Sequence, residues 1–265
     1  MISLIELLKE AVSKPKAIIL AGAPGAGKGY ILRGLDLAGL KVLNVDDIYV
    51  PLLQKANVTL DLKNATPEER SEQAKQMAAA NKQFKGDVEA TIEGKESFIL
   101  DGTGASYNST AKLKNELEEA GYKVFMLYVY TDLQRSLSQN QDRYEKSEGK
   151  DRSLAPAIVM RTWKSVTDNL PKYAELFGNN FVAVANTLDD KMQDIDKIIK
   201  KYLTPFDPQG TKPKTPKEQA KSDARKAKDK EEIQAMLSDD FIYDVIEYTI
   251  SKEEAQMRIG KFLNS

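Results

Sequence analysis

The chain has 265 residues, of which 41% are hydrophobic and 30% are charged, and its formal net charge is -1. These values are ordinary for a globular enzyme, and they give no overall basic field that would draw the protein to nucleic acid or anionic lipid. The sequence contains no cysteine and no histidine, which excludes disulfides, zinc–thiolate sites, imidazole bases and Ser-His-Asp triads.

The N-terminal residues predict a short amphipathic helix over residues 3–12, with Leu4, Leu7 and Leu8 on one face. Charges interrupt this stretch at helical spacing, unlike the apolar region of a signal peptide. No apolar run in the sequence approaches the roughly 20 residues that a membrane helix needs. We therefore expect a cytoplasmic protein without a membrane contact.

Apolar strand patterns and helical periodicities alternate along the next part of the chain. They predict, in order, strand 16–21, helix 28–38, strand 41–45, helix 66–92 in one piece or in two around Gly86, strand 97–100, helix 109–120, strand 123–130, helix 132–146, helix 154–175, strand 180–185 and helix 189–203. The run TPEE over residues 66–69 begins the long helix with an N-cap, a proline and two acids. Nearly continuous apolar strands that alternate with helices indicate right-handed crossovers and a buried parallel sheet. The expected fold class is therefore α/β, with a five-stranded parallel sheet.

The C-terminal part of the chain differs in composition from the rest. Residues 204–230 are charged and rich in proline and lysine, so we expect a linker in which residues 217–230 form either an exposed helix or a disordered stretch. Residues 231–265 regain helical periodicity and predict a small helical appendage. Two alternatives stay open for its apolar residues: they pack back on the core, or they bind a protein partner or a second copy of the chain.

A glycine-rich segment follows the first strand and matches the G-x-x-x-x-G-K pattern of phosphate-binding loops. It consists of Gly22, Ala23, Pro24, Gly25, Ala26, Gly27 and Lys28. In such a loop, backbone N–H groups surround the phosphates, the N-terminus of the next helix adds a favourable dipole, and the lysine neutralises charge. The sequence therefore predicts a P-loop nucleotide-binding fold with ATP as its cofactor.

The residues after the lysine depart from the usual pattern, because Gly29 stands where a serine or threonine normally contacts Mg²⁺. The segment from Gly22 to Gly29 resembles that of adenylate kinases and related nucleoside monophosphate kinases, which have threonine at the next position, where this chain has Tyr30. We expect Gly29 and Tyr30 to lie at the nucleotide. We expect Mg²⁺ to be held by phosphates, waters and Asp101, since this ion needs few protein ligands.

Two acids, Asp46 and Asp47, end the second strand, at the carboxyl edge where open α/β sheets bind ligands. A kinase that phosphorylates a hydroxyl needs a carboxylate there to orient the hydroxyl and accept its proton. The run NVDDIY over residues 44–49 resembles the segment after the second strand in zeta-toxin-type kinases, chloramphenicol phosphotransferases and polynucleotide kinases. The resemblance implies that Asp47 is the catalytic base, with Asp46 as the second choice. Alternatively, one of the pair caps the following helix.

Another acid, Asp101, ends the third strand, where P-loop proteins place the Walker B acid that holds Mg²⁺ through water. The run DGTG over residues 101–104 also resembles the acid-Gly-Thr segment of the zeta-toxin group. This resemblance implies that Asp101 and Thr103 face the acceptor. The alternative is ordinary turn chemistry, because Asp-Gly is a common turn sequence.

Three arginines, Arg143, Arg152 and Arg161, lie around a charged loop in the second half of the chain. Phosphoryl transfer needs cationic groups as charge spreads over the oxygens of the transferred group. Residues 144–160 resemble the lid that closes over ATP in this kinase class. The resemblance implies that Arg143 reaches the adenine or the phosphates, and that Arg152 and Arg161 reach the γ-phosphate or the acceptor. Alternatively, these arginines are simply solvated.

Two further assignments come from the same resemblance, which covers roughly residues 15–200 and implies a kinase domain over residues 1–203. Related kinases contact the adenine from the loop after the fifth strand, which implies Asn186 as a nucleotide ligand. They bind the acceptor in an inserted subdomain, which corresponds here to the helical insert at residues 57–95.

The function that these patterns predict is ATP-dependent transfer of the γ-phosphate to a hydroxyl of a small molecule, a nucleotide sugar or a polynucleotide end, so that nucleic acid enters only as a substrate end. The Asp46-Asp47 pair favours a hydroxyl acceptor, because an anionic phosphate acceptor requires arginines in place of a base. Two alternatives stay open. The phosphate loop favours a nucleoside monophosphate kinase, whereas Gly29 and the C-terminal segment are compatible with a non-catalytic nucleotide-binding protein that assembles with others.

Overall fold

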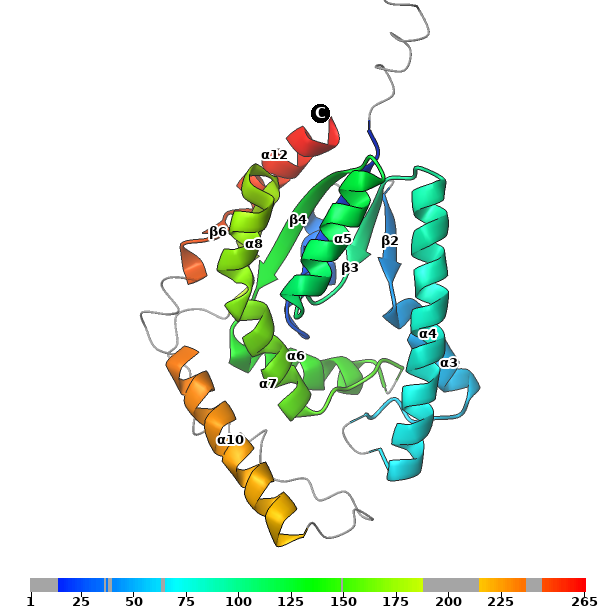
Figure 1. The fold of residues 1–265 in the computed structure, drawn as a ribbon, viewed down its shortest axis with the longest axis vertical. Coiled ribbons are helices and arrows are strands. Elements are labelled where there is room, and N and C mark those ends of the chain that lie inside the picture. The colour runs from blue at the N-terminus through cyan, green and yellow to red at the C-terminus, as the bar shows by residue number, and fades with distance from the viewer. Residues whose placement is uncertain are drawn as a thin grey trace, which may run out of the picture.

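This computed structural model describes residues 14–187, apart from residues 36, 38, 39, 63, 64 and 149, and also residues 215–236 and 245–265. Its centre is a parallel β-sheet with the strand order β2-β3-β1-β4-β5-β6 (Figure 1). The strands are β1 (Lys16–Ala21), β2 (Lys41–Asn44), β3 (Phe98–Asp101), β4 (Lys123–Tyr130), β5 (Phe181–Ala185) and β6 (Thr249–Ile250).

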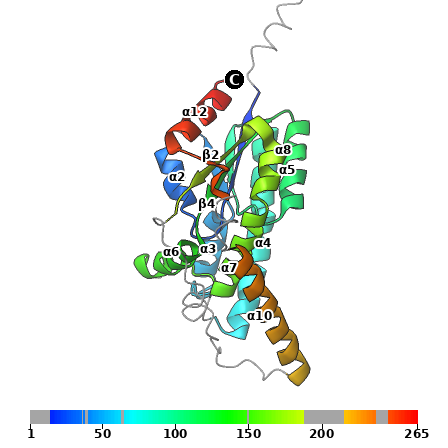
Figure 2. The ribbon, with the colours of Figure 1, turned by 90° about the vertical axis from the view of Figure 1, so that its left-hand side faces the viewer.

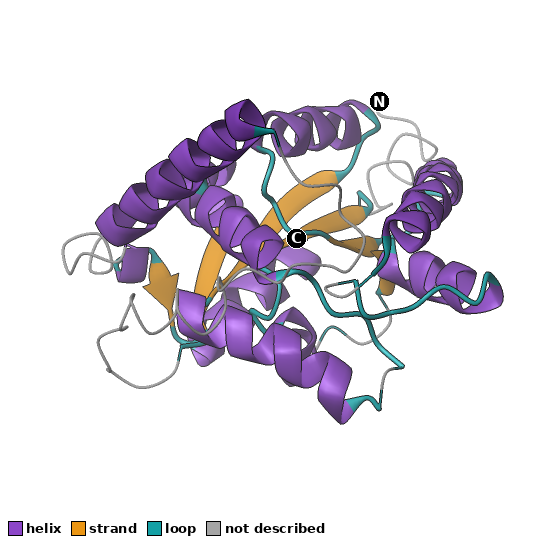
Figure 3. Ribbon diagram, turned by 90° about the horizontal axis from the view of Figure 1, so that it is seen from below, coloured by secondary structure: helices purple, strands orange, loops and turns teal. Residues whose placement is uncertain are grey.

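Helices cover both faces of this sheet, as Figure 3 shows from below. In the described part of the chain they are α2 (Lys28–Gly34), α3 (Asp46–Lys55), α4 (Pro67–Glu93), α5 (Tyr107–Glu119), α6 (Leu133–Lys146), α7 (Pro156–Asp168), α8 (Leu170–Phe177), the short 3-10 helix η1 (Gly178–Asn180), α10 (Pro216–Met236) and α12 (Lys252–Leu263). Helices α2 and α12 lie on one face, and α5 and α8 lie on the other (Figure 2).

The central strands are apolar throughout because both of their faces are covered. Every residue of β1 is buried. Its alternate side chains enter different clusters: Ile18 and Leu20 pack on the face of α2 and α12, whereas Ala17 and Ile19 pack on the face of α5 and α8. This two-sided burial fixes the register of the sheet, because a slip by one residue would exchange the two faces.

The predicted α/β fold class is confirmed, but the predicted number of five strands is wrong. A sixth strand, β6, pairs in parallel with β5 through Ala183–Thr249 and Val184–Ile250. Because β6 has only two residues, its sequence carries no alternating pattern that could be recognised, and it had been included in the C-terminal helical segment.

Several helix boundaries differ from the predicted ones. Helix α2 ends at Gly34, because Leu35 turns into an extended conformation and is buried against the sheet. The predicted helix at 154–175 is two helices, α7 and α8, which meet at Asn169. The long helix α4 continues through Gly86 in one piece, and it begins with the predicted cap, a reciprocal pair of hydrogen bonds between Thr66 and Glu69.

Helix α3 was not among the predicted elements, although the alternative role of Asp46 or Asp47 as a helix cap implies a helix at this place. Its sequence combines β-branched residues with an internal proline, Pro51, which normally argues against a helix. Its first turn nevertheless contains Asp46 and Asp47, whose negative charges are favourable at a helix N-terminus. Asp46 and Asp47 therefore lie just after the end of strand β2 and also in the first turn of helix α3.

The C-terminal segment contains two described helices. Helix α10 begins at Pro216 with a capping pair of Thr215 and Glu218, which agrees with the exposed-helix alternative for residues 217–230 and extends it to Met236. Helix α12 packs back on the sheet and buries Ala255, Ile259 and Phe262. The predicted helices at 3–12 and 189–203 lie outside the described residues. None of the helices that the structure describes is long and apolar enough to span a bilayer.

The contact between α12 and the sheet predicts a strong effect on stability. The rings of Phe262 and Phe125 lie 4.9 Å apart between centroids, and Phe262 is only 7% exposed. Phe262→Ala should lower the free energy of unfolding by about 3 kcal/mol, the usual loss for a buried aromatic side chain. Denaturant unfolding measures this difference. Met257→Ala is the control, because Met257 lies on the same helix but is 54% exposed; equal effects of the two substitutions would contradict the packing of α12.

Candidate active site

The loop between β1 and α2 has a shape that depends on its glycines. Gly25 and Gly27 have φ angles of 75° and 79°, in the left-handed region that other residues rarely adopt. Gly27 is also the N-cap of α2, where the first N–H groups of a helix lack partners within the helix. Loop and helix therefore offer backbone amides to an anion, in the strand–loop–helix arrangement that a phosphate-binding loop requires.

The amine of Lys28 lies over this loop. Its Nζ donates a hydrogen bond to the carbonyl of Gly22 at 3.2 Å and lies 3.8 Å from the Oδ1 of Asp101. Burial lowers the pKa of Lys28 from its usual value, and the charge of Arg143 adds to this effect, whereas the charge of Asp101 opposes it. Because burial disfavours the charged form of this amine, an anion that binds beside it stabilises the ammonium form.

The carboxylate of Asp101 joins two strand ends. Its Oδ2 accepts a hydrogen bond from the Nδ2 of Asn44 at 3.0 Å, and the Oδ1 of Asn44 in turn accepts from the backbone N–H of Asp46 at 2.9 Å. Burial raises the pKa of Asp101, the Lys28 ammonium lowers it, and the nearby carboxylates of Asp46 and Asp47 raise it further. Asn44 was not predicted as a site residue, although it begins the quoted run at 44–49.

Asp46 and Arg152 form an ion pair across the site. The Nη2 of Arg152 lies 2.7 Å from both carboxylate oxygens of Asp46, and only Oδ2 has the geometry of a hydrogen bond. The guanidinium also lies 5.8 Å from the ring centroid of Tyr49, which is on α3 and is buried against the helical insert. The predicted lid arginine and the predicted second-choice base are therefore partners in this structure.

Asp47 is exposed, and among the described residues its carboxylate has no hydrogen-bond or ion-pair partner, unlike that of Asp46. Its charge is nevertheless close enough to raise the pKa of Asp101. A free carboxylate beside the phosphate loop is available to accept a proton from an acceptor.

The other two predicted arginines lie in different places. The Nε of Arg143 donates to the carboxylate of Asp151, and its charge acts on both Lys28 and Asp101, so it belongs to the site. Arg161 is exposed, and its Nε donates to the Ala157 carbonyl of its own helix at 3.1 Å. In the part of the chain that is described, no interaction joins Arg161 to the phosphate loop.

Three further residues were predicted beside the phosphate loop, and each has different surroundings in the structure. The carbonyl of Thr103 accepts a hydrogen bond from the N–H of Gly22 at 3.0 Å, and its exposed side chain lies beside the loop. Tyr30 is 58% exposed and lies beneath the Nζ of Lys252, which is 4.7 Å from its ring centroid. A Cβ at Gly29 would meet only the Nη1 of Arg33, at 3.6 Å, so the missing hydroxyl is not explained by lack of space.

The segment that carries Arg152 is held by neighbours on both sides. Ser153 donates from its hydroxyl to Asp61 at 2.9 Å and from its backbone to the carbonyl of Leu60 at 3.1 Å. The side chain of Asn140, on α6, exchanges two hydrogen bonds with the backbone of Leu154. The predicted lid 144–160 is thus attached to the helical insert and to α6.

Two side chains contact the outside of the phosphate loop. The Nδ2 of Asn186 donates to the carbonyl of Ala26 at 2.8 Å, and the hydroxyl of Ser136 donates to the carbonyl of Pro24 at 2.5 Å. Asn186 was expected at the adenine, and its side chain instead contacts the loop backbone. Ser136 was not predicted, because a serine within a helix carries no signal in the sequence.

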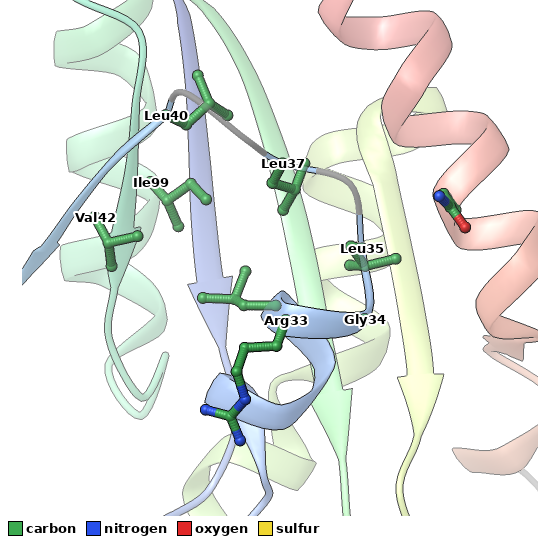
Figure 4. Close-up of a pocket in the computed structure, with 9 residues that line it drawn as sticks. Arg33, Gly34, Leu35, Leu37, Leu40, Val42 and Ile99 are labelled. Atoms are coloured by element: carbon green, nitrogen blue, oxygen red, sulfur yellow. The ribbon is translucent and has the colours of Figure 1, made fainter.

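The cavity in Figure 4 is not part of this site. It has a volume of about 540 Å³ and lies beside the C-terminal end of α2, the strands β2 and β3, and α12. Its lining residues are Leu32, Arg33, Gly34, Leu35, Leu37, Leu40, Val42, Ile99 and Gln256. None of the predicted site residues lines it.

The acidic residues of the site fit a magnesium ion that binds together with the phosphates of a nucleotide. They do not fit an ion that is held by protein ligands alone. The described residues contain no group of three or more potential acidic ligands that could hold a metal ion. The carboxylates of Asp46 and Asp47 nevertheless repel the charge on Asp101 and raise its pKa, and a divalent cation would relieve this repulsion. Mg²⁺ commonly binds through one or two carboxylates together with substrate phosphates.

Comparison with solved structures finds the same fold. The crystal structure of an AvrRxo1-ORF1:AvrRxo1-ORF2 complex with sulphate ions is 16% identical, with a TM-score of 0.50, and the match covers 97% of this chain and 83% of that chain. A structure from the PezAT chromosomal toxin–antitoxin system of Streptococcus pneumoniae is 17% identical, with a TM-score of 0.45, and the match covers 88% of this chain and 93% of that chain. No curated protein matches the sequence.

The match to a protein family is more specific than these likenesses. The zeta toxin model matches residues 4–198, which is more than half of the 265-residue chain and includes the phosphate loop, the acidic pair and Asp101. The chain therefore belongs to the zeta toxin family of P-loop kinases.

Proposed function

We propose that this protein is an ATP-dependent kinase that transfers the γ-phosphate of ATP to a hydroxyl group, with magnesium as the accompanying ion. One observation carries the proposal: Lys28, Asp101 and the Asp46–Arg152 pair gather beside a phosphate loop, at the edge where β1, β2 and β3 end. Family membership supports phosphotransfer at the level of the family. The hydroxyl would belong to a small molecule, a nucleotide sugar or a polynucleotide end.

The residues of the site would divide the work of phosphoryl transfer. Backbone amides of the loop bind the phosphates, and Lys28 neutralises charge at the β- and γ-phosphates. Arg152 and Arg143 stabilise the charge that spreads over the transferred group. Asp101 would help to hold a magnesium ion, which would neutralise phosphate charge when bound. Asn186 would affect nucleotide binding indirectly, because its side chain holds the backbone of the phosphate loop at Ala26.

Asp47 is better suited than Asp46 to act as the base. Asp46 is paired with Arg152 at 2.7 Å, whereas Asp47 is exposed and is close enough to act on the charge of Asp101. As Asp47 takes the proton of the acceptor hydroxyl, the acceptor oxygen forms a bond to the γ-phosphorus, and the bond to the bridging oxygen of the β-phosphate breaks.

The same charges favour a neutral hydroxyl acceptor over an anionic phosphate acceptor. A free carboxylate repels a second anion that enters the site, and the Arg152 guanidinium is already engaged by Asp46. A nucleoside monophosphate kinase would need unpaired cations at this position. The arrangement therefore supports a hydroxyl kinase over that alternative.

The role of Asp47 predicts a separation of binding from transfer. Asp47→Asn should leave the dissociation constant of ATP unchanged and lower the rate of transfer by at least about 100-fold, because the amide cannot accept the proton. A screen for mass shift with ATP and Mg²⁺ identifies the acceptor, and a rate assay with that acceptor measures the effect. Asp87→Asn, an exposed substitution on α4, is the matched control. A fully active Asp47→Asn protein would mean that the base lies elsewhere.

The lowered pKa of Lys28 predicts how polyphosphate binding depends on pH. In the free protein this pKa lies below its ordinary value of 10.5, and a bound polyphosphate raises it again, so binding takes up a proton between the two values. Affinity for tripolyphosphate should therefore be constant below the lowered pKa and fall by up to about tenfold per pH unit above it. Titration calorimetry without magnesium, in buffers of different ionisation enthalpy, measures both effects.

Lys28→Arg provides the control for this titration, because arginine keeps its charge throughout the range. Its affinity for tripolyphosphate should change with pH only through the ionisation of the ligand, so the ratio of the wild-type affinity to that of Lys28→Arg isolates the titration of Lys28. Affinity of the wild-type protein that stays constant up to pH 10.5 would contradict a role for the Lys28 ammonium in phosphate binding.

The open space at Gly29 allows a test of the magnesium proposal. Gly29→Ser adds a hydroxyl where many phosphate loops contact Mg²⁺, and a Cβ fits there without a clash. The Mg²⁺ concentration that gives half-maximal ATP binding should fall by several-fold, since one further oxygen ligand becomes available. Gly86→Ser, at an equally open position on α4, controls for the substitution itself. The same Mg²⁺ requirement in both variants would argue against a metal ion at this place.

A further inference from the structure

The side chains of Ser136 and Asn186 each donate a hydrogen bond to a backbone carbonyl of the phosphate loop. Ser136, on α6, donates to the carbonyl of Pro24 at 2.5 Å, and Asn186, after β5, donates to the carbonyl of Ala26 at 2.8 Å. Ser136 is fully buried. The two hydrogen bonds thus hold the Pro24–Gly25 peptide and the Ala26–Gly27 peptide, which are separated by one peptide in the middle of the loop.

Each of these hydrogen bonds determines the direction of an amide. The peptide bond is planar and trans, so its C=O and its N–H point in opposite directions. Holding the Pro24 carbonyl against Ser136 turns the N–H of Gly25 away from α6. Holding the Ala26 carbonyl against Asn186 turns the N–H of Gly27 away in the same manner.

The two glycines are also in very close contact with these neighbours. A Cβ at Gly25 would lie 2.4 Å from the carbonyl oxygen of Ser136, and a Cβ at Gly27 would lie 2.3 Å from the Nδ2 of Asn186. Both glycines have positive φ angles as well. The loop therefore lies directly on α6 and on the segment after β5, with no room for a side chain at Gly25 or Gly27.

Helix α6 connects the loop with the segment that carries Arg152. Ser136 contacts the loop, and Asn140, four residues further along the helix, exchanges two hydrogen bonds with Leu154. The same helix carries Arg143 near its end. One rigid element thus sets the distance between the loop amides and the arginines.

We infer that Ser136 and Asn186 are positioning residues that hold the phosphate loop in its anion-binding conformation before the nucleotide arrives. This role rests on the proposed function, because it assumes that the loop amides bind a polyphosphate. Without the two hydrogen bonds, the peptides at Pro24 and Ala26 rotate among several orientations, and binding must select the productive one. Removal of these hydrogen bonds therefore raises the dissociation constant and leaves the rate of transfer unchanged, since the loop is correctly oriented once the ligand is bound.

The test measures the dissociation constants of tripolyphosphate and of ATP with Mg²⁺, together with the melting temperature. Ser136→Ala should weaken binding of both ligands about fivefold, the factor that corresponds to one buried hydrogen bond. Asn186→Ala should act similarly, and the double variant should lose more than either. Ser138→Ala is the matched control, because Ser138 is on the same helix but donates to the Arg135 carbonyl within it. This control should bind both ligands as the wild-type protein does.

A kinetic measurement separates positioning from a purely structural role. With ATP as the varied substrate, Ser136→Ala should raise KM about fivefold and leave kcat within about twofold. A lower melting temperature with unchanged dissociation constants would overturn the inference and leave Ser136 a structural residue. Failure of the wild-type protein to bind either ligand would overturn the proposed function, and this role with it, whereas equal binding by the wild type, Ser136→Ala and Asn186→Ala would overturn only the role.

Discussion

The candidate site depends on the parallel pairing of three neighbouring strands. Asp101 at the end of β3 pairs with Leu20 of β1 on one side and with Asn44 of β2 on the other. This register places the phosphate loop, the acidic pair and Asp101 at one edge of the sheet, although they are distant in sequence. A slip of β3 by one residue would turn Asp101 to the opposite face and remove the partner of Lys28. Two-sided burial of the central strands excludes that slip, so the apolar core determines the geometry of the polar site.

The parts of the fold that could be predicted are those that local sequence specifies. Strand β4 has the predicted bounds because the seven residues after Lys123 are suited to burial on both faces, and α4 begins at the predicted cap because Thr66 and Glu69 are both present. The phosphate loop was found because its glycines are needed for its backbone conformation. Where the local signal is weak or misleading, as in the two-residue β6 or around Pro51 in α3, the prediction was wrong or missing.

The contacts that complete the site are non-local, and sequence patterns do not contain them. Arg152 reaches Asp46 across 106 positions, Ser136 reaches Pro24 across 112, and Asn186 reaches Ala26 across 160. A resemblance can propose that such residues belong to a site, as it did for Arg152 and Asn186. It does not give the partner of each side chain, which depends on how helices and strand ends pack in space. The pairing of Asp46, which makes Asp47 the free carboxylate, is therefore visible only in the folded structure.

Charge pairing among the side chains of the site explains why a metal ion should accompany the nucleotide. A buried charge without a partner is costly, and in this structure Lys28 is paired with Asp101 at 3.8 Å and Arg152 with Asp46 at 2.7 Å. Burial raises the pKa of Asp101, and the charges of Asp46 and Asp47 add to this effect while Lys28 opposes it. A polyphosphate that takes over both cations would leave the three carboxylates close to one another without that opposing charge. A divalent cation bound between phosphate and carboxylate removes this repulsion. Nucleotide and metal binding are therefore expected to be coupled, through the carboxylates that pair with Lys28 and Arg152 in this structure.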